Sequence, residues 1–173
     1  FFSYEQLDGI VPNEPFTVEQ KIDGSLGILY WLNGEPYIST RGAFDSPQAL
    51  HATEILHAHY RNLGFHPGVT YLFEIVYPEG RVVVDYGATD DLILLAAFET
   101  DSGLEVSIEE TPYMVAMRNA RHYPDLQNQD LEFVRGSQMV NAEGFVLRFA
   151  SGIRVKIKFD EYKRLHRLLT GLN

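Results

Sequence analysis

The sequence contains no cysteine, and none of its apolar runs approaches the roughly 20 residues that a membrane-spanning helix requires. The first absence excludes disulfide bonds and thiolate metal sites. No secretory signal peptide is visible either, so we expect a cytoplasmic location by default. A chain of 173 residues with 45% apolar content fits one globular domain that buries a sizeable core.

Basic residues are also scarce. Lysine and arginine total 14 against 24 aspartates and glutamates, which gives a net charge of −10. This balance argues against a broad electropositive surface for nucleic acid, so any phosphate binding must be local. Only four lysines are present, and two of them, Lys156 and Lys158, are separated by a single residue.

The residue patterns predict an α+β domain dominated by antiparallel hairpins. Runs of β-branched, aromatic and apolar residues indicate strands where turn residues such as Asn33-Gly34 bound them. The expected strands cover residues 16–20, 26–32, 36–40, 71–77, 81–86, 92–99, 104–108, 144–150 and 153–159. Helices are expected over 47–63, irregularly over 111–135 with a break at Pro124, and over 161–169 with Asp160 as the cap.

The first candidate site is the hexapeptide Lys21-Ile22-Asp23-Gly24-Ser25-Leu26. It follows a predicted strand, so Lys21 lies at a strand end and the chain turns through Asp23-Gly24. We expect Gly24 to permit a tight turn because glycine adopts positive φ without steric penalty. A lysine held in a cleft becomes a nucleophile where burial or nearby cations disfavour its charged form. The alternative is a surface lysine before a polar turn, since so short a motif has many chance matches.

Two glutamates interrupt apolar strands. Glu74 is the centre of Tyr71–Tyr77, and Glu143 opens a strand beside Gly144, which permits close backbone approach. A carboxylate within an apolar strand costs desolvation unless something pairs with it. Glu74 therefore either faces water on an edge strand or faces a cleft, where it meets a sugar hydroxyl or a hydrated metal. Together the two glutamates would supply the carboxylates that Mg²⁺ prefers.

A row of cations marks the strand predicted for residues 153–159. Arg154, Lys156 and Lys158 alternate strictly with apolar residues, so the three cations share one face. The usual explanation of such a row is the solvated outer face of a sheet. Like charges side by side repel, however, and a bound phosphate would relieve that repulsion.

The histidines offer a weaker signal. His51, His57 and His59 share one predicted helix. Their spacing does not give the i, i+4 pair of a zinc-binding helix. We therefore assign them to the helix surface and the edge of the core.

Taken in order, these motifs resemble the lysine-dependent nucleotidyltransferases, which comprise DNA ligases, RNA ligases and mRNA capping enzymes. The similarity is closest to the phage-type ATP-dependent RNA ligase 1 family and extends from about Phe1 to Lys158. The matching segments are Lys21–Leu26, Ser39–Gly42, Phe73–Pro78, Arg81–Tyr86, Glu143–Val146 and Lys156–Lys158. Each segment is a weak signal alone, whereas the ordered set is a strong one.

The resemblance implies an adenylation domain over residues 1–173, with two antiparallel β-sheets, flanking helices and a likeness to the ATP-grasp fold. It also implies a reaction that uses ATP and Mg²⁺ or Mn²⁺. Lys21 would take AMP as a phosphoramidate. Lys156 and Lys158 would grip the phosphates and would be catalytic together with Lys21 and Glu143. Glu143 would orient the hydrated metal, and Glu74 would hold the ribose or a metal-bound water.

Further positions would complete the implied nucleotide site. Arg41 would contact the nucleotide or an RNA phosphate. Val146 and an apolar residue near Phe98 would sandwich the adenine, and Glu19 and Gln20 would present backbone atoms to its edge. The motif of Lys21 adds Asp23 and Gly24 to the nucleotide-binding set.

The activity that the resemblance implies is the sealing of RNA 5′-phosphate and 3′-hydroxyl ends, as in RNA or tRNA repair, without a membrane partner. Alternatives are a DNA ligase or capping-type nucleotidyltransferase of the same fold, a nucleotide-binding module without catalysis, or a plain interaction domain. Members of the resembled family also carry a basic segment before the equivalent of Phe1 and a C-terminal domain. We therefore expect this chain to be a fragment of a longer enzyme.

Overall fold

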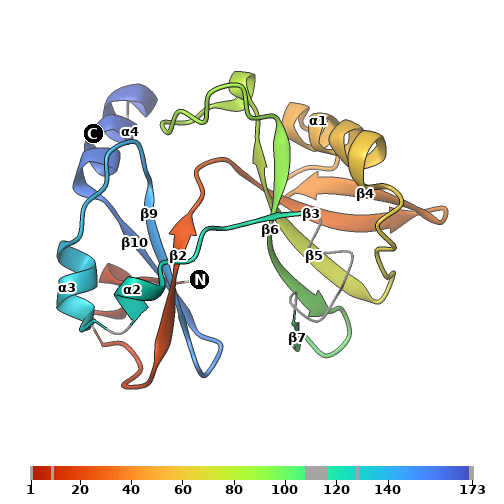
Figure 1. Cartoon of the computed structure of the whole chain (residues 1–173). Helices are drawn as coiled ribbons and strands as arrows, with labels where there is room; N and C mark the ends of the chain where they lie inside the picture. The colour runs from red at the N-terminus through yellow and green to blue at the C-terminus, as the bar shows by residue number, and fades with distance from the viewer. Residues whose placement is uncertain (1, 9, 108–116, 128, 172–173) are drawn as a thin grey trace. The chain divides into compact units, whose positions relative to one another are not determined.

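The computed structural model describes residues 2–8, 10–107, 117–127 and 129–171 (Figure 1). The chain forms two compact units, each built around one β-sheet. Unit 1 comprises Phe1–Asp23, Val82–Asp85 and Ala120–Asn173, and unit 2 comprises Gly24–Arg81 and Tyr86–Asn119. Two sheets accompanied by a few helices confirm the α+β class that the sequence predicts.

The sheet of unit 1 has the strand order β1-β10-β9-β2. Its strands are β1 (Phe2–Ser3), β10 (Arg154–Lys158), β9 (Gly144–Phe149) and β2 (Phe16–Lys21). Strands β10, β9 and β2 are antiparallel neighbours, whereas β1 pairs in parallel with β10. The helices described in this unit are α2 (Pro124–Gln127), α3 (Leu131–Gly136) and α4 (Asp160–Thr170), and the segment Glu5–Leu7 forms a 3-10 turn.

Alternation along these strands gives the sheet of unit 1 one apolar face. Phe145, Leu147 and Val155 are fully buried. The ring of Phe159, which follows β10, packs edge-on against Phe145 with ring centroids 4.9 Å apart. Burying side chains of this size contributes about 1.5–3 kcal/mol each. This core therefore fixes the register of the strands that carry the candidate residues.

The sheet of unit 2 has the strand order β4-β3-β5-β6-β7, and β8 pairs in parallel with β6. Its strands are β3 (Ser25–Leu32), β4 (Glu35–Thr40), β5 (Val69–Val76), β6 (Asp91–Glu99), β7 (Glu105–Val106) and β8 (Arg118–Asn119). Asn33 and Gly34 join β3 to β4 with φ angles of 52° and 83°. Positive φ at both positions is what the predicted two-residue hairpin turn requires.

Helix α1 (Pro47–Ile55) packs against the sheet of unit 2 (Figure 1). It begins as predicted, with proline at its start and the Ser46 side chain accepting a hydrogen bond from the Ala49 N–H. It continues as a π-helical turn, Leu56–Tyr60, and ends there rather than at residue 63. Ile55 and Leu56 enter a core that strands β3, β4, β5 and β6 complete.

The strand predicted for residues 81–86 was wrong. Residues 78–80 form a 3-10 turn, and the following segment forms no strand although it is rich in valine. The N–H groups of Val83 and Val84 instead donate to the carboxylate of Asp23. These two N–H groups therefore bind the side chain of Asp23, which is distant in sequence, and are not available to pair with a neighbouring strand.

The helical region predicted for residues 111–135 was also partly wrong. Residues 108–116 lie outside the described residues, and strand β8 follows at Arg118–Asn119. Pro124 opens helix α2 instead of breaking a helix, because proline is tolerated in a first turn. At the C-terminal end, Asp160 is the first residue of α4 and Phe159 holds the cap position, with no side-chain capping bond. In the part of the chain that the structure describes, no helix is long and apolar enough to cross a bilayer.

Candidate functional site

Strand register brings two lysines to either side of one glycine in unit 1. Lys21, the last residue of β2, is the partner of Gly144, the first residue of β9. Lys158, the last residue of β10, is the partner of the same glycine on the other side. Because neighbouring strands lie about 4.8 Å apart, the two lysines leave the sheet at the same end and within reach of one group.

The carboxylate of Glu143 is that group. Lys21 Nζ donates to Glu143 Oε2 at 2.8 Å, and Lys158 Nζ lies 2.9 Å from Oε1. The Glu143 side chain is 3% exposed, against 20% for Lys21 and 35% for Lys158. A carboxylate so deeply buried requires charged or hydrogen-bonding partners. Three residues that the sequence singled out in separate motifs therefore form one ion-paired group.

Close backbone contacts explain why glycine stands beside this group. Gly144 has a φ of 156°, and a Cβ atom there would lie 1.9 Å from the Ile157 carbonyl oxygen. The predicted close approach at Gly144 is thus confirmed. The positive φ expected at Gly24 was wrong, because Gly24 is not among the glycines with positive φ. A Cβ atom at Gly24 would instead lie 2.3 Å from the carbonyl oxygen of Ile75 in β5, so close approach is again the reason.

A second buried carboxylate fixes the chain directly after Lys21. Asp23 is 5% exposed, and its Oδ2 accepts hydrogen bonds of 2.8 Å from the N–H groups of Val83 and Val84. Its Oδ1 accepts a 2.7 Å hydrogen bond from the Tyr162 hydroxyl of helix α4. Lys158 Nζ lies 4.9 Å from the centroid of the Tyr162 ring. Tyr162 therefore contacts both the turn that follows Lys21 and the second lysine of the ion-paired group.

The neighbouring positions of the same sheet carry the remaining unit 1 candidates. Glu19, Val146 and Lys156 form the next row across β2, β9 and β10. Alternation places them on the same face as Lys21 and Lys158. Arg154, two residues further along β10, is only 9% exposed. The cationic row is therefore not a uniformly solvated outer face, since its members differ in burial and in partners.

Gln20 lies on the opposite face from Lys21 by the same alternation. Its backbone N–H donates to the carbonyl of Arg121 at 2.7 Å. That donor is therefore already occupied within unit 1 and is not available for the expected backbone contact of Gln20 with a base edge.

Unit 2 carries four of the predicted site residues: Gly24, Arg41, Glu74 and Phe98. Glu74 lies in the middle of β5, paired with Leu26 of β3 and Ile93 of β6. Because β5 has a strand on each side, the edge-strand alternative for Glu74 is wrong. Phe98 lies near the end of β6 and is half-buried, as is Glu74.

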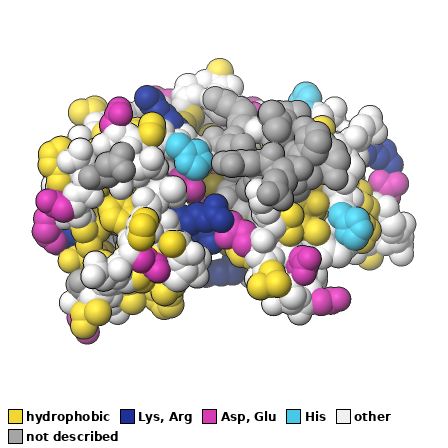
Figure 2. Space-filling model, turned by 60° about the horizontal axis from the view of Figure 1, so that its bottom comes forward, with side chains coloured by type: hydrophobic (Ala, Val, Ile, Leu, Met, Phe, Trp, Pro, Cys, Tyr) yellow, Lys and Arg dark blue, Asp and Glu magenta, His cyan; other side chains and the backbone are white. Residues whose placement is uncertain are grey.

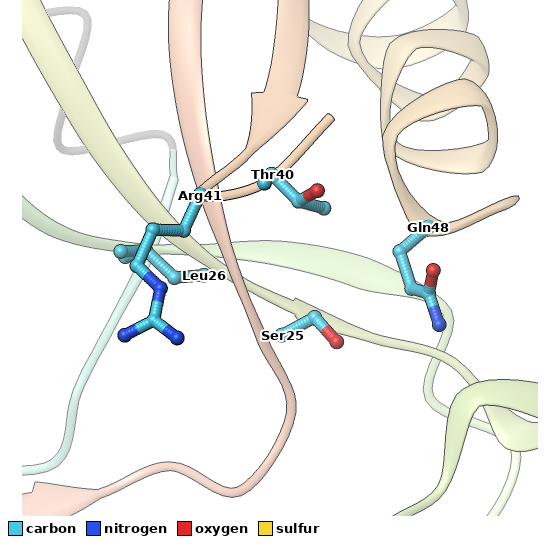
Figure 3. A pocket seen from close by; sticks show the side chains of 6 residues that line it. Ser25, Leu26, Thr40, Arg41 and Gln48 are labelled. Carbon is cyan, nitrogen blue, oxygen red and sulfur yellow. The ribbon is translucent and has the colours of Figure 1, made fainter. Parts of the chain in front are cut away.

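A pocket of about 460 Å³ lies beside Arg41 in unit 2. The residues that line it are Ser25, Leu26, Thr40, Arg41, Gly42 and Gln48. Figure 3 shows the guanidinium group of Arg41 pointing away from the side chains of Thr40 and Gln48. Hydroxyl, amide and guanidinium groups provide donors for an anionic oxygen, so this pocket suits a phosphate better than an apolar ligand.

Charged side chains outside these sites behave as ordinary surface pairs. The Lys163 side chain holds the pKa of Asp160 below its usual range by a hydrogen bond and by charge. The hydrogen bond from Arg164 likewise lowers the pKa of Glu161. On the face drawn in Figure 2, lysine and arginine side chains stand in small groups among acidic and apolar ones.

A metal ion would find few direct ligands here. Among the described residues, no group of three or more histidine, aspartate and glutamate side chains could hold one. Both oxygens of Glu143 already accept from lysines. Mg²⁺ commonly keeps several waters and uses phosphate oxygens as further ligands. An ion at this site would therefore depend mainly on its own waters and on the phosphate oxygens of a ligand.

Sequence reasoning missed Tyr162 and the N–H groups of Val83 and Val84. The three groups meet at Asp23, which is 139 residues from Tyr162 and about 60 from the valines. The sequence placed Asp23 in a turn close to an expected strand, and nothing in that placement showed that its carboxylate would be buried and would need donors. Nothing local in the sequence identifies which donors they are.

Comparison with known proteins links this arrangement to one group of folds. No protein-family profile matches the chain. A lysine-to-alanine mutant of Naegleria gruberi RNA ligase with ATP and Mn has a TM-score of 0.68 at 17% identity, covering 96% of this chain and 56% of that chain. The same ligase with PPi has a TM-score of 0.66 at 17% identity, covering 89% and 52%. An archaeal ATP-dependent RNA ligase has a TM-score of 0.62 at 19% identity, covering 87% and 44%.

The chain therefore has the α+β fold of RNA ligase nucleotidyltransferase domains and spans about half the length of these structures. Identities of 17–19% establish the fold alone. Of the residues that the sequence resemblance singles out, Lys21, Glu143 and Lys158 form one ion-paired group in unit 1, and Arg41 lines a pocket in unit 2.

Proposed function

We propose that this chain is the adenylyltransferase domain of an ATP-dependent RNA ligase and that Lys21 is its nucleophile. The observation that carries the proposal is the pairing of Lys21 and Lys158 with one buried carboxylate, Glu143. The shared fold with RNA ligases, one of them with ATP and Mn, supports a nucleotide as the ligand of this group.

In the proposed first step, the Lys21 amine attacks the α-phosphorus of ATP. A P–N bond to Lys21 forms while the P–O bond to the β-phosphate breaks, and pyrophosphate leaves with the bonding electron pair. Lys21 must lose a proton before it attacks, and Glu143 Oε2, 2.8 Å from Nζ, is the acceptor placed to take it. Lys158 and Lys156 are proposed to stabilise the negative charge that develops on the phosphates.

In the following steps, an RNA 5′-phosphate oxygen attacks the lysyl-AMP phosphorus and releases Lys21. A 3′-hydroxyl then attacks the activated 5′-phosphate, forms the phosphodiester and expels AMP. Arg41 is proposed to contact a phosphate group, and Val146 and Phe98 to contact the adenine. Glu19, Gln20, Asp23 and Gly24 complete the proposed nucleotide-binding set.

A divalent cation, Mg²⁺ or Mn²⁺, fits this proposal as a hydrated ion. Glu143 is proposed to hold a water ligand of the ion, and Glu74 to hold a metal-bound water or the ribose. When bound, the ion would neutralise charge on the phosphates. The residues of the chain would still bind the base, orient the phosphates and hold the Lys21 proton.

The test is covalent labelling. The protein is incubated with ATP and Mg²⁺, its intact mass is measured, and the modified peptide is mapped. We expect a gain of one AMP on the peptide that contains Lys21, lability of the adduct in acid, and no adduct in Lys21→Ala. An adduct on a different lysine, or a folded protein that gains no AMP, would contradict the proposal.

The same assay separates the proposal from its alternatives. GTP in place of ATP tests a capping-type enzyme, and we expect GTP to label poorly. Sealing of 5′-phosphorylated DNA ends in preference to RNA ends would indicate a DNA ligase. ATP binding without any covalent adduct would indicate a nucleotide-binding module.

A further inference from the structure

A row of aromatic rings lies on one face of the β3–β4 hairpin in unit 2. Tyr30 and Tyr37 are register partners, and their rings stack with centroids 5.8 Å apart and an interplanar angle of 29°. Phe44, from the loop that follows β4, meets the Tyr30 ring edge-on at 4.9 Å. Phe44 is 68% exposed. A large ring so exposed adds little to the core, yet it packs against the Tyr30 ring.

The Arg41 pocket lies at one end of this row. Leu26, which lines the pocket, and Tyr30 lie four residues apart on β3 and therefore on the same face. They are separated by about 13 Å along the strand. Among the described residues of unit 2, no acidic side chain is within ion-pair distance of the Arg41 guanidinium. One face of the hairpin thus combines an available cation with a line of aromatic rings.

We infer that this face, defined by Arg41, Phe44, Tyr30 and Tyr37, binds a single-stranded segment of the RNA substrate. The inference rests on the proposed function, because that function supplies RNA as the ligand. Arg41 contacts a backbone phosphate at the pocket, and bases next to that phosphate stack on Phe44 and on the exposed parts of the tyrosine rings.

The chemistry of the face favours a nucleic-acid strand over other ligands. Single strands are bound by aromatic side chains that stack on bases and by cations that follow the backbone. The protein has a net charge of −10, so a polyanion is held only where a cation is free and additional attraction is available. Stacking supplies that attraction, because it does not depend on the overall charge.

Phe44 is the position to test. We compare Phe44→Ala, Phe44→Leu and Phe44→Trp with Phe133→Ala, which removes a 55% exposed phenylalanine from unit 1 and serves as the matched control. Affinity for a short 5′-phosphorylated single-stranded oligoribonucleotide is measured by fluorescence anisotropy at several salt concentrations. Formation of the Lys21–AMP adduct is measured in the same variants, because it reports the proposed function separately.

We expect Phe44→Ala and Phe44→Leu to weaken RNA binding about fivefold or more, and Phe44→Trp to retain or improve it, because only a ring stacks on bases. Arg41→Gln should weaken binding and reduce the slope of log affinity against log salt by about 1. The Phe44 variants and Phe133→Ala should still form the Lys21–AMP adduct. Unchanged binding in Phe44→Ala, equal binding by Leu and Trp, a comparable loss in Phe133→Ala, or preference for single-stranded DNA would overturn the inference.

The two proposals fail differently. If the adduct forms but RNA binding does not depend on Phe44, the strand-binding face is wrong and the adenylyltransferase proposal stands. If no adduct forms but binding depends on Phe44 and Arg41, the face binds RNA and the catalytic proposal is wrong.

Discussion

The two units hold their candidate cations in opposite ways. In unit 1, Lys21 and Lys158 both pair with Glu143, a carboxylate that is almost fully buried. In unit 2, Arg41 is exposed at the edge of an open pocket. Groups that are held before a ligand arrives lose less entropy when they react, whereas an exposed arginine is ordered only by its ligand. This difference fits the two proposals, in which Lys21 of unit 1 carries out the reaction and the β3–β4 hairpin of unit 2 binds the RNA strand.

Gly144 of unit 1 and Gly42 of unit 2 show the same contrast. A side chain at Gly144 would collide with the backbone of β10, whereas a Cβ atom at Gly42, in the lining of the Arg41 pocket, would meet nothing within 4 Å. The packing of unit 1 therefore reaches to the edge of the ion-paired group. The pocket of unit 2 leaves room around its residues.

Lys21→Arg should have the largest effect on activity. Arginine keeps a cation beside Glu143, but the guanidinium does not lose its proton and cannot act as the nucleophile. We expect complete loss of the AMP adduct by intact mass, while the free energy of unfolding in urea changes by no more than about 1 kcal/mol. An adduct at the parental level in this variant would show that Lys21 is paired but not reactive.

Gly144→Ala should have the largest effect on stability. The new Cβ atom would lie 1.9 Å from the Ile157 carbonyl oxygen, so β9 and β10 must separate locally. We expect a loss of more than about 3 kcal/mol in the free energy of unfolding, or failure to fold. Gly42→Ala is the control and should stay within about 0.5 kcal/mol of the parent. Equal stability of the two variants would contradict the packing described for unit 1.

Much of the fold could be predicted because its signals are local. Asn33-Gly34 marks a hairpin, and strands β2, β3, β4, β6 and β9 lie within a few residues of their predicted ranges. The run at residues 81–86 failed because its valine content is typical of a strand, while its N–H groups bind the distant Asp23. A local pattern carries no information about such an acceptor.

The candidate site could also be predicted only in part. The motifs singled out Lys21, Glu143 and Lys158, but their mutual contact depends on the register of three strands, which the sequence does not state. Tyr162 was missed because it lies in the terminal helix, outside every motif. Its role follows only from the hydrogen bond that its hydroxyl donates to Asp23.

Comparing Lys158→Gln with Lys156→Gln should show how much the ion pair with Glu143 contributes to stability, because only Lys158 of these two lysines in β10 pairs with that carboxylate. Lys158→Gln leaves buried Glu143 with Lys21 alone, and we expect a loss of about 1–2 kcal/mol in the free energy of unfolding. Lys156→Gln, at a position with no carboxylate partner among the described residues of unit 1, should cost less than about 0.5 kcal/mol. Urea denaturation measures both.

A further variant sharpens that test. Replacing both Lys21 and Lys158 by glutamine would leave Glu143 buried without a cation, so the loss should exceed the sum of the two single losses. Additive losses would mean that the two lysines stabilise Glu143 independently. Equal losses in Lys158→Gln and Lys156→Gln would mean that the Lys158–Glu143 pair contributes little to the fold.

Tyr162→Phe should have a modest effect on stability and the most specific effect of this series. It removes the hydroxyl that donates to Asp23 Oδ1 but keeps the ring beside Lys158. Asp23 retains its two backbone donors, so we expect a loss of about 1 kcal/mol. Tyr4→Phe, which removes a longer 3.3 Å hydrogen bond with Arg135 in the same unit, is the control and should cost less.

The rate of adduct formation decides what the Tyr162 hydroxyl does. Because Asp23 fixes the chain two residues after Lys21, a less well held carboxylate should let the Lys21 amine move relative to its target. We expect Tyr162→Phe to form the Lys21–AMP adduct several-fold more slowly at saturating ATP, with unchanged ATP affinity, while Tyr4→Phe reacts at the parental rate. A parental rate in Tyr162→Phe, accompanied by the expected loss of stability, would mean that the hydroxyl supports the fold of unit 1 and not the position of Lys21.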